Sequence, residues 1–341
     1  MSSSTLENRS VTLADIAREV GVTPITVHNA LNGKGRVSPG MRERVLETAR
    51  EMGYQSNLLA RSLATGRAMA LGVLAYRIES NLAARQLAAV ENEAQKHGYH
   101  LVVAAHNHDP QRALEALREM TARRMDGVIS ISSTANMQPG VVEGLKTLQL
   151  PTVFSFHEPH GPRESDCVTI DQQQGARKAV DFLLRQGRNK IAFLSGPRGR
   201  LVTETRLEGF EMALRAAGFE PSTAPRAFAE DFSPRHGKSE AHQLLESKPD
   251  AIFCASDGLA ASVLRAARDR WLRVPADLMV IGFDDSLLCE ATDPTLTSVQ
   301  MPIEEVGREC VRRLLFRLEN PQDWSPQTQR LNCRLIRRES A

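Results

Sequence analysis

The sequence predicts an all-α N-terminal module followed by a larger α/β core, in which each of two lobes contains a doubly wound parallel sheet. The length of 341 residues exceeds what one compact core usually holds, so several units are expected. Apolar residues recur at helical spacing near the N-terminus, and from Ala70 onward short apolar strands alternate with amphipathic helices. We therefore expect three parts, with the boundaries 1–56, 57–69 and 70–341.

The composition is that of a soluble globular protein, with 41% hydrophobic and 25% charged residues. The longest apolar runs, Ala68–Tyr76 and Ala251–Ala255, are far shorter than the ~20 residues that span a bilayer. The first residues lack a basic patch followed by an apolar segment, so we expect no secretion signal and a cytoplasmic location.

The cysteines lie far apart and form no Cys-x-x-Cys pair. This pattern is typical of reduced, buried thiols in a reducing compartment, so we expect neither a structural metal nor a cofactor. The five are Cys167, Cys254, Cys289, Cys310 and Cys333.

The charge is unevenly distributed, although the net charge of the chain is only +2. Residues 1–69 hold nine Lys and Arg against six Asp and Glu, so the positive charge is concentrated in the N-terminal module. Such a bias is typical of a module that contacts phosphates.

Two short helices are predicted at the start of the module. Thr12 is placed to cap the first, Gly21 to end it, and Thr23 to cap a second that begins at Pro24 and runs to about Asn32. The inward residues of the first are Leu13, Ile16, Ala17 and Val20. Those of the second are Val27, Ala30 and Leu31, which leaves Pro24, Ile25, His28 and Asn29 on the outer face.

A third helix is expected from Ser38 as cap and Pro39 as first residue. Its predicted inward residues are Val45, Leu46, Ala49 and Met52. Two short helices joined by a tight turn seat the second helix in a major groove, but a three-helix packing module with no nucleic-acid role fits the spacing equally well.

The actual residues of this module resemble the headpiece of the LacI/GalR family of bacterial regulators. The resemblance runs over VTLADIAREVGVTPITVHNALNG (residues 11–33) and continues through Arg36–Pro39, Arg44-Val45 and Gly53-Tyr54. It implies base contacts from Pro24, Ile25 and Asn29, where asparagine can pair with adenine and isoleucine can lie against a thymine methyl. The implied DNA-contacting residues of the module are Thr12, Thr23, Pro24, Ile25, Thr26, His28, Asn29, Asn32 and Arg36.

This sequence departs from the family pattern at one pair of positions. Many members carry Ser-Arg where His28-Asn29 stand, so the operator sequence cannot be carried over. For His28, a phosphate contact or a plain surface role remains as an alternative to base contact.

The segment 57–66 consists of good helix formers but is too short to form a stable helix alone. It is similar to the family's hinge helix, which implies that Leu63 wedges into a base step of the minor groove, that Ala60 lets two backbones approach, and that Asn57 contacts DNA. The alternative is an ordinary linker with Leu59 and Leu63 packed on the core.

The core pattern alternates strands and helices as a doubly wound sheet does. The predicted strands are Leu71–Tyr76, His100–Ala105, Gly127–Ser132, Pro151–Phe156, Val168–Asp171, Lys190–Ser195, Arg226–Ala229, Ala251–Ala255 and Leu278–Phe283. The predicted helices are Ala83–His97, Pro110–Arg123, Gly175–Gln186, Glu204–Ala217 and Arg235–Ser247. We expect two lobes of periplasmic-binding-protein type with a ligand cleft between them.

Ligands of open α/β sheets bind beyond the carboxyl ends of the strands, so the strand ends indicate the site. The motifs there, among them Gly282-Phe-Asp-Asp285, also resemble the family's core motifs, and the resemblance implies that Arg206 and Asp284 grip ligand oxygens. The alternative for each is a surface ion pair. The candidate ligand-binding residues are Ser80, Arg85, Asp171, Arg206, Phe232, Ser256 and Asp284.

The first lobe departs from the family, because Ser80–Ala83 stand where many members have Asn-Pro-Phe-Phe. The sequence therefore does not identify the effector, the small metabolite that is expected to bind between the lobes and control DNA binding. The pair Arg85 and Arg206 favours an anionic or polyhydroxylated compound such as a sugar, a sugar acid or a sugar phosphate.

Two other function classes fit less well. An enzyme would need a catalytic constellation, and we find neither a Gly-x-x-x-x-Gly-Lys loop nor a Gly-x-Ser-x-Gly elbow. A periplasmic solute receptor would share the core but lack the helical module. We predict a homodimeric repressor of a pseudo-palindromic operator, since one headpiece reads only a half-site.

Overall fold

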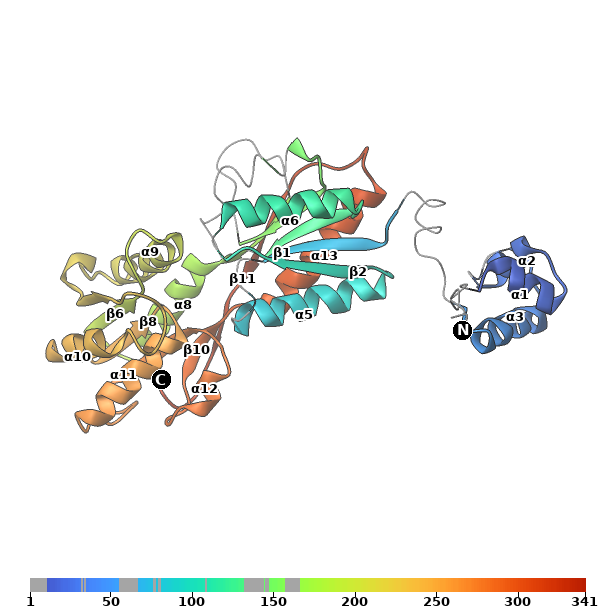
Figure 1. Ribbon diagram of the computed structural model, residues 1–341. Coiled ribbons are helices and arrows are strands. Elements are labelled where there is room, and N and C mark those ends of the chain that lie inside the picture. The colour runs from blue at the N-terminus through green and yellow to red at the C-terminus, as the bar shows by residue number, and fades with distance from the viewer. Residues whose placement is uncertain are drawn as a thin grey trace, which may run out of the picture. The chain divides into compact units, whose positions relative to one another are not determined.

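The computed structural model describes residues 11–31, 33, 35–54, 67–75, 78, 81–107, 109–131, 144, 147–156 and 166–341. The chain divides into two compact units, Met1–Ala68 and Met69–Ala341 (Figure 1). We call them the headpiece and the core.

Three helices form the described part of the headpiece: α1 (Leu13–Val20), α2 (Pro24–Leu31) and α3 (Pro39–Glu51). A capping box begins α1, because the Thr12 hydroxyl accepts from the Asp15 N–H while an Asp15 carboxylate oxygen lies 3.0 Å from the Thr12 nitrogen. Gly21 ends α1 in the left-handed conformation at φ 77°.

The headpiece core gathers the predicted inward residues with one exception. Ile16, Val27 and Val45 are fully buried, whereas the expectation that Leu46 faces inward is wrong, since 41% of it is exposed. The inward side of α3 follows Val45 and Ala49 at a spacing of four, so the next position along the helix turns away from the narrow face that two short neighbours can cover.

The first lobe of the core is a six-stranded sheet in the order β11-β5-β4-β3-β1-β2, with all neighbours parallel. Helices α5 and α13 pack against each other on one face of it, and α6 lies on the other (Figure 1). The strands are β1 (Ala70–Ala75), β2 (His100–Ala105), β3 (Gly127–Ile131), β4 (Thr152–Ser155), β5 (Asp166–Asp171) and β11 (Thr328–Asn332). The helices are α5 (Asn81–Lys96), α6 (Pro110–Ala122) and α13 (Ile303–Glu319).

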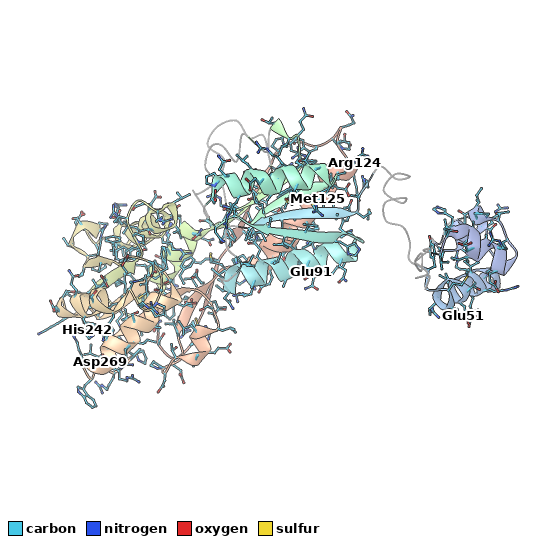
Figure 2. All side chains as sticks on the ribbon, viewed as in Figure 1. Glu51, Glu91, Arg124, Met125, His242 and Asp269 are labelled. Carbon is cyan, nitrogen blue, oxygen red and sulfur yellow. The ribbon has the colours of Figure 1, made fainter. Side chains whose placement is uncertain are left out.

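The second lobe has the order β12-β10-β9-β8-β6-β7, parallel except for β12. Helices α8 and α9 pack together on one face and α10 and α11 on the other, where His242 Nε2 lies 3.9 Å from Asp269 Oδ2 (Figure 2). The strands are β6 (Ile191–Ser195), β7 (Arg226–Phe228), β8 (Ala251–Cys254), β9 (Met279–Asp284), β10 (Thr297–Gln300) and β12 (Arg334–Ile336). The helices are α8 (Gln172–Arg185), α9 (Leu201–Ala216), α10 (Lys238–Glu246), α11 (Asp257–Asp269) and α12 (Leu288–Ala291), with the 3-10 turn η1 (Pro221–Thr223).

The chain passes between the lobes three times: after β5, after β10, and between β11 and β12. Each predicted strand and helix has a counterpart, but α11, α12, α13, η1 and the strands after β9 were not predicted. Helix α8 begins three residues before its predicted start because Asp171 caps it. Within the described ranges every helix is too short or too polar to span a lipid bilayer.

Candidate functional site

The outer face of α2 is exposed as predicted. Ile25 is 72% exposed and Pro24 and His28 are also exposed, while Asn29 is half-buried. At the start of the helix the hydroxyls of Thr23 and Thr26 lie 2.9 Å apart. Two of the three side chains predicted to contact bases, Pro24 and Ile25, thus lie on the exposed side of α2.

The structure says less about the other candidate DNA contacts. Arg36 is exposed. The Thr12 hydroxyl is used in the cap of α1, where it donates to the Asp15 carboxylate at 2.6 Å. Asn32, Asn57, Ala60 and Leu63 lie outside the described residues.

In the core, Arg206 of α9 forms the centre of a buried polar site. Its Nε and Nη2 donate to Gln172 Oε1 at 3.0 and 2.7 Å, and Nη2 lies 3.4 Å from Asp284 Oδ1. Its Nη1 donates to the Ala255 carbonyl, and the guanidinium carbon lies 3.8 Å from the centre of the Phe283 ring. The strand ends of β8 and β9 thus hold a guanidinium that is only 4% exposed. We call Arg206, Gln172 and Asp284 the Arg206 site.

Burial shifts the pKa of both members of this pair. It raises the pKa of Asp284 to about 7, although the neighbouring Arg206 cation lowers it, and the nearby Asp257 raises it further. Burial also lowers the pKa of Arg206, which Asp284 partly offsets. A carboxyl group that changes charge near neutral pH is therefore held in contact with a buried arginine.

The Ser256 side chain is hydrogen-bonded to the main chain of Phe232. The Ser256 hydroxyl donates to the Phe232 carbonyl at 2.9 Å and accepts from the Leu259 N–H at 3.2 Å as the cap of α11. Ser256 is 3% exposed. It therefore positions the Phe232 loop, and a Cβ on Gly196 would lie 2.7 Å from the Phe232 ring, so glycine there leaves room for that ring.

The remaining candidates lie around this centre. Asp171 caps α8 by accepting from the Gln174 N–H at 2.9 Å, directly before Gln172. Arg85 of α5 pairs with Glu304 at 2.7 Å and donates to the Asp285 carbonyl at 3.3 Å. Ser80 lies outside the described residues. Contacts thus connect Arg206 with Asp284 and, through the adjacent residues, with Ser256, Asp171 and Arg85.

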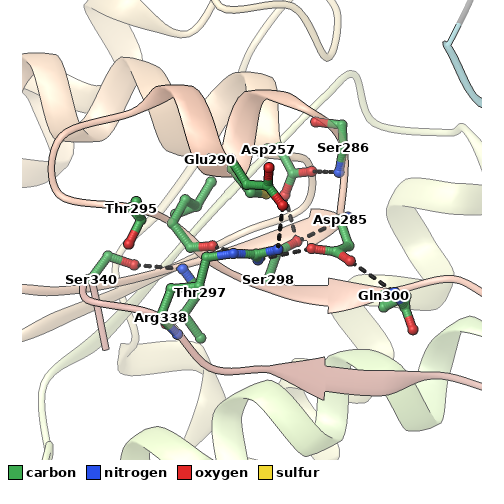
Figure 3. A network of polar contacts seen from close by, with 12 residues as sticks. Asp257, Asp285, Ser286, Glu290, Thr295, Thr297, Ser298, Gln300, Arg338 and Ser340 are labelled. Carbon is green, nitrogen blue, oxygen red and sulfur yellow. Dashed lines mark hydrogen bonds and ion pairs between the residues drawn. The ribbon is translucent and has the colours of Figure 1, made fainter.

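A polar network fixes the turn after β9 (Figure 3). The buried Asp257 accepts from the Ser286 N–H at 2.7 Å and from the Ser298 hydroxyl at 2.5 Å. The Asp285 carboxylate accepts from Gln300 at 2.9 Å and lies 2.8 Å from Arg338 Nη1. Asp284 and Asp285 have φ values of 109° and 53°, which residues other than glycine rarely adopt. The network therefore holds a strained turn.

Sequence reasoning did not identify Gln172 and Glu304, which contact Arg206 and Arg85. Gln172 follows the end of β5, so the rule that ligands bind at strand ends applied to it, but it carries no charge to attract attention. Glu304 stands 219 positions from its partner Arg85, and no local pattern joins the two. Among the described residues, no group of three or more His, Cys, Asp or Glu side chains is arranged to hold a metal ion.

Two family models match the chain. Residues 12–57 match the model for bacterial regulatory proteins of the lacI family, and residues 180–341 match a periplasmic binding protein-like domain. Catabolite control protein A of Priestia megaterium is 33% identical over 308 residues, which cover 89% of this chain and 92% of that protein. The chain belongs to the LacI family.

Solved structures of LacI family members have the same fold. The lac repressor dimer bound to operator and the anti-inducer ONPF superposes with a TM-score of 0.80 at 25% identity, covering 97% of this chain and 99% of that one. The regulator CelR in complex with cellobiose has a TM-score of 0.71 at 28% identity, covering 97% of this chain and all of that one. The protein is thus a DNA-binding transcriptional regulator with two parallel-sheet lobes, as the sequence predicted.

Proposed function

We propose that this LacI family member is a cytoplasmic repressor that binds a pseudo-palindromic operator as a homodimer, and that a small metabolite bound at the Arg206 site controls its operator affinity. The observation that carries the proposal is that one chain combines an exposed recognition helix with a buried, charge-paired polar site at strand ends. A pure DNA-binding protein would have no use for the second feature.

The proposed operator contacts are those of the α2 face. Pro24, Ile25 and Asn29 are assigned to base edges, and the supporting contacts are Thr12, Thr23, Thr26, His28, Asn32 and Arg36. The linker residues Asn57, Ala60 and Leu63 are assigned to the central minor groove. Leu63→Ala should weaken operator binding at least tenfold, by about 1.4 kcal/mol or more, and leave effector affinity unchanged; equal operator affinity would reject the wedge role.

The charge balance supports a neutral, polyhydroxylated effector over a sugar acid or a sugar phosphate. Arg206 is paired with Asp284 and Arg85 with Glu304, so neither cation is left without a carboxylate. An anionic effector at the Arg206 site would have to displace the Asp284 carboxylate, whereas hydroxyl groups can bond to both Arg206 and Asp284. The cellobiose bound by the structural relative CelR is a compound of the favoured class.

A second copy of the chain is the proposed partner of the β2 edge. This strand ends the sheet of the first lobe, and its Val102 and Val103 are 41% and 42% exposed. Apolar residues on an open edge strand favour pairing with another chain. The lac repressor that shares this fold was solved as a dimer on its operator.

The decisive experiment is selection of bound sequences from random duplex DNA, repeated with a panel of neutral sugars, sugar acids and sugar phosphates. We expect one palindromic motif whose recovery changes with a neutral sugar. The proposal fails if the protein shows no sequence preference and its DNA affinity does not fall steeply with salt. Removal of residues 1–66 should abolish DNA binding but retain effector binding, and the reverse result would also contradict it.

A further inference from the structure

One side chain of the first lobe reaches the turn that carries Asp284 in the second. Arg85 forms a two-pronged pair with Glu304, with Nε–Oε1 at 2.7 Å and Nη2–Oε2 at 3.2 Å, and its Nη1 donates to the Asp285 carbonyl at 3.3 Å. We call Arg85, Glu304 and the Asp285 carbonyl the interlobe contact. It is distinct from the Arg206 site, whose three residues lie at the start of α8, in α9 and at the end of β9.

The Arg85–Glu304 half of this contact belongs to the first lobe alone. Arg85 stands on α5 and Glu304 on α13, and these helices approach closely at Gly307, where an added Cβ would lie 2.8 Å from the Gln86 carbonyl and 2.9 Å from the Ala89 Cβ. Such packing fixes both helices as one body. Glu304 therefore holds the planar guanidinium in a set direction, with Nη1 turned to Asp285.

The other half is a single peptide group of the second lobe. The Asp285 carbonyl accepts from Arg85, and the Ser286 N–H of the same peptide donates to the buried Asp257 at 2.7 Å. Because a peptide group is planar, rotation of this unit changes both hydrogen bonds together. Asp257 is 2% exposed, so loss of its bond would leave a buried carboxylate poorly satisfied.

The same turn ends at the Arg206 site. Asp284 precedes this peptide by one residue, has a φ of 109°, and presents its carboxylate to Arg206 at 3.4 Å. A strained turn that is held from both ends has few conformations available, so a change at Asp284 is passed to the peptide that Arg85 binds. Two consecutive residues, Asp284 and Asp285, thus connect the Arg206 site to Arg85 of the first lobe.

We propose that Arg85 is a positioning residue that fastens the first lobe to the Asp284–Asp285 turn, and that this contact links the state of the effector site to the relative position of the lobes. The proposal rests on the proposed function and concerns regulation of the same site. Arg85 itself does not bind the effector in this account. Its guanidinium is already committed to Glu304 and the Asp285 carbonyl.

The test measures the distance between the lobes without any ligand or DNA, on the full-length chain. Spin labels are attached through Glu115→Cys on α6 and Arg268→Cys on α11, both exposed, and the five native cysteines are buried and protected from labelling. Pulsed electron paramagnetic resonance then gives the distribution of distances between the two labels. We expect Arg85→Met to raise about tenfold the fraction of molecules whose interlobe distance differs from the main distance of the parent protein. A tenfold shift of this equilibrium corresponds to the loss of one charge-assisted hydrogen bond.

Arg308→Met is the matched control. Arg308 lines the same groove between α5 and α13 but pairs with Glu305 of its own helix, so its removal should leave the distribution as in the parent protein. Glu304→Gln should produce part of the Arg85→Met effect and add nothing to it in the double variant. If Arg85→Met folds poorly, Arg85→Lys, which keeps the charge but not the fork, should still broaden the distribution.

The link to the effector site is tested by Asp284→Asn in the same labelled chain. This change should alter the distribution when Arg85 is present and have no further effect in the Arg85→Met background. Identical distributions in the parent, Arg85→Met and Arg308→Met proteins would overturn the proposal. Because no effector or operator is used, that outcome is independent of whether the proposed function holds.

Discussion

In the headpiece the side chains proposed to contact base edges in the major groove stand on one short helix, whereas in the core the Arg206 site is assembled from segments that lie far apart in the chain. The capping contacts that organise the headpiece join residues three positions apart. The contacts of Arg206 span 34, 49 and 78 positions, and that of Arg85 spans 219. The headpiece also exposes its functional face, while the core buries the corresponding groups.

The comparison teaches that the two functions place different demands on the sequence. A recognition surface needs only a helix with correct ends and an apolar inner face, so residues on its outer face are free to vary with the operator. A buried charged site needs every surrounding segment in place, because an arginine removed from water must have its partners supplied. The core should therefore tolerate backbone crowding far less than the headpiece.

The largest predicted effect tests this tolerance at Gly209. A Cβ there would lie 2.2 Å from the Gln173 carbonyl and 2.8 Å from the Ala176 Cβ, so Gly209→Ala must push α9 away from α8. We expect a loss of about 3 kcal/mol in the unfolding free energy of the core. Denaturation followed by tryptophan fluorescence reports on the core alone, since Trp271 and Trp324 both lie there.

The matched change in the headpiece is Gly40→Ala. A Cβ at this position meets nothing within 4 Å, and the glycine stands within α3, where alanine should stabilise the helix by about 0.5–1 kcal/mol. The tryptophan signal of this variant should match the parent's. Amide hydrogen exchange of α1, α2 and α3 measures the stability of the headpiece itself, and a loss there as large as the loss in the core at Gly209 would contradict the distinction between the two units.

The same difference explains what the sequence could predict. The helices of the headpiece, their caps at Thr12, Thr23 and Ser38, and the exposure of Ile25 follow from local patterns, and the structure has them all. Leu46 was placed wrongly because periodicity alone does not tell how wide a stripe the neighbouring helices cover.

In the core, local patterns predicted individual strands but not which sheet each one joins. Strand β11 pairs with β5 across more than 150 positions. No local sequence pattern indicates that the chain returns to the first lobe through α13. Arg206 and Asp284 were predicted as ligand-binding residues from the strand ends and from a family resemblance, and neither source predicted their contact with each other. Gln172 and Glu304, for which no such information was used, were missed.

The next effect in size concerns effector binding at Arg206. Arg206→Ala should lower effector affinity about 100-fold, since charge-assisted hydrogen bonds are worth about 1.5–3 kcal/mol each. Asp284 can take up a proton once its cationic neighbour is gone, which limits the damage to the fold. Titration calorimetry with the sugar found in the panel measures the loss.

Operator affinity in the absence of effector serves as the control for Arg206→Ala and should stay at the parent's value. Arg206→Lys should recover only part of the effector affinity, because an ammonium group cannot bind two acceptors in the plane of the guanidinium. Unchanged effector affinity in the alanine variant would remove Arg206 from the binding site.

A smaller effect is expected from pH. The pKa of Asp284 is raised by burial to about 7, so the carboxylate form that accepts a bond from an effector hydroxyl increases as pH rises. If only this form binds, effector affinity should rise about tenfold between pH 6 and pH 8. Asp284→Asn should bind more weakly and show no such rise, whereas a pH dependence that survives in this variant would assign the titration to another group.

The smallest effect sharpens the comparison from the side of the headpiece. Ile25→Ala should weaken operator binding by about 1 kcal/mol, or about fivefold, by removing an apolar contact with a base methyl group. Because Ile25 is 72% exposed, the melting temperature of the headpiece should not change. Effector affinity, measured on the same preparation, should also match the parent's, since Ile25 belongs to the other compact unit. Binding to the selected operator by fluorescence anisotropy decides the matter: equal loss on operator and random duplex would show that Ile25 contributes no sequence recognition. The interpretation of α2 as the recognition helix would then rest on Pro24 and Asn29.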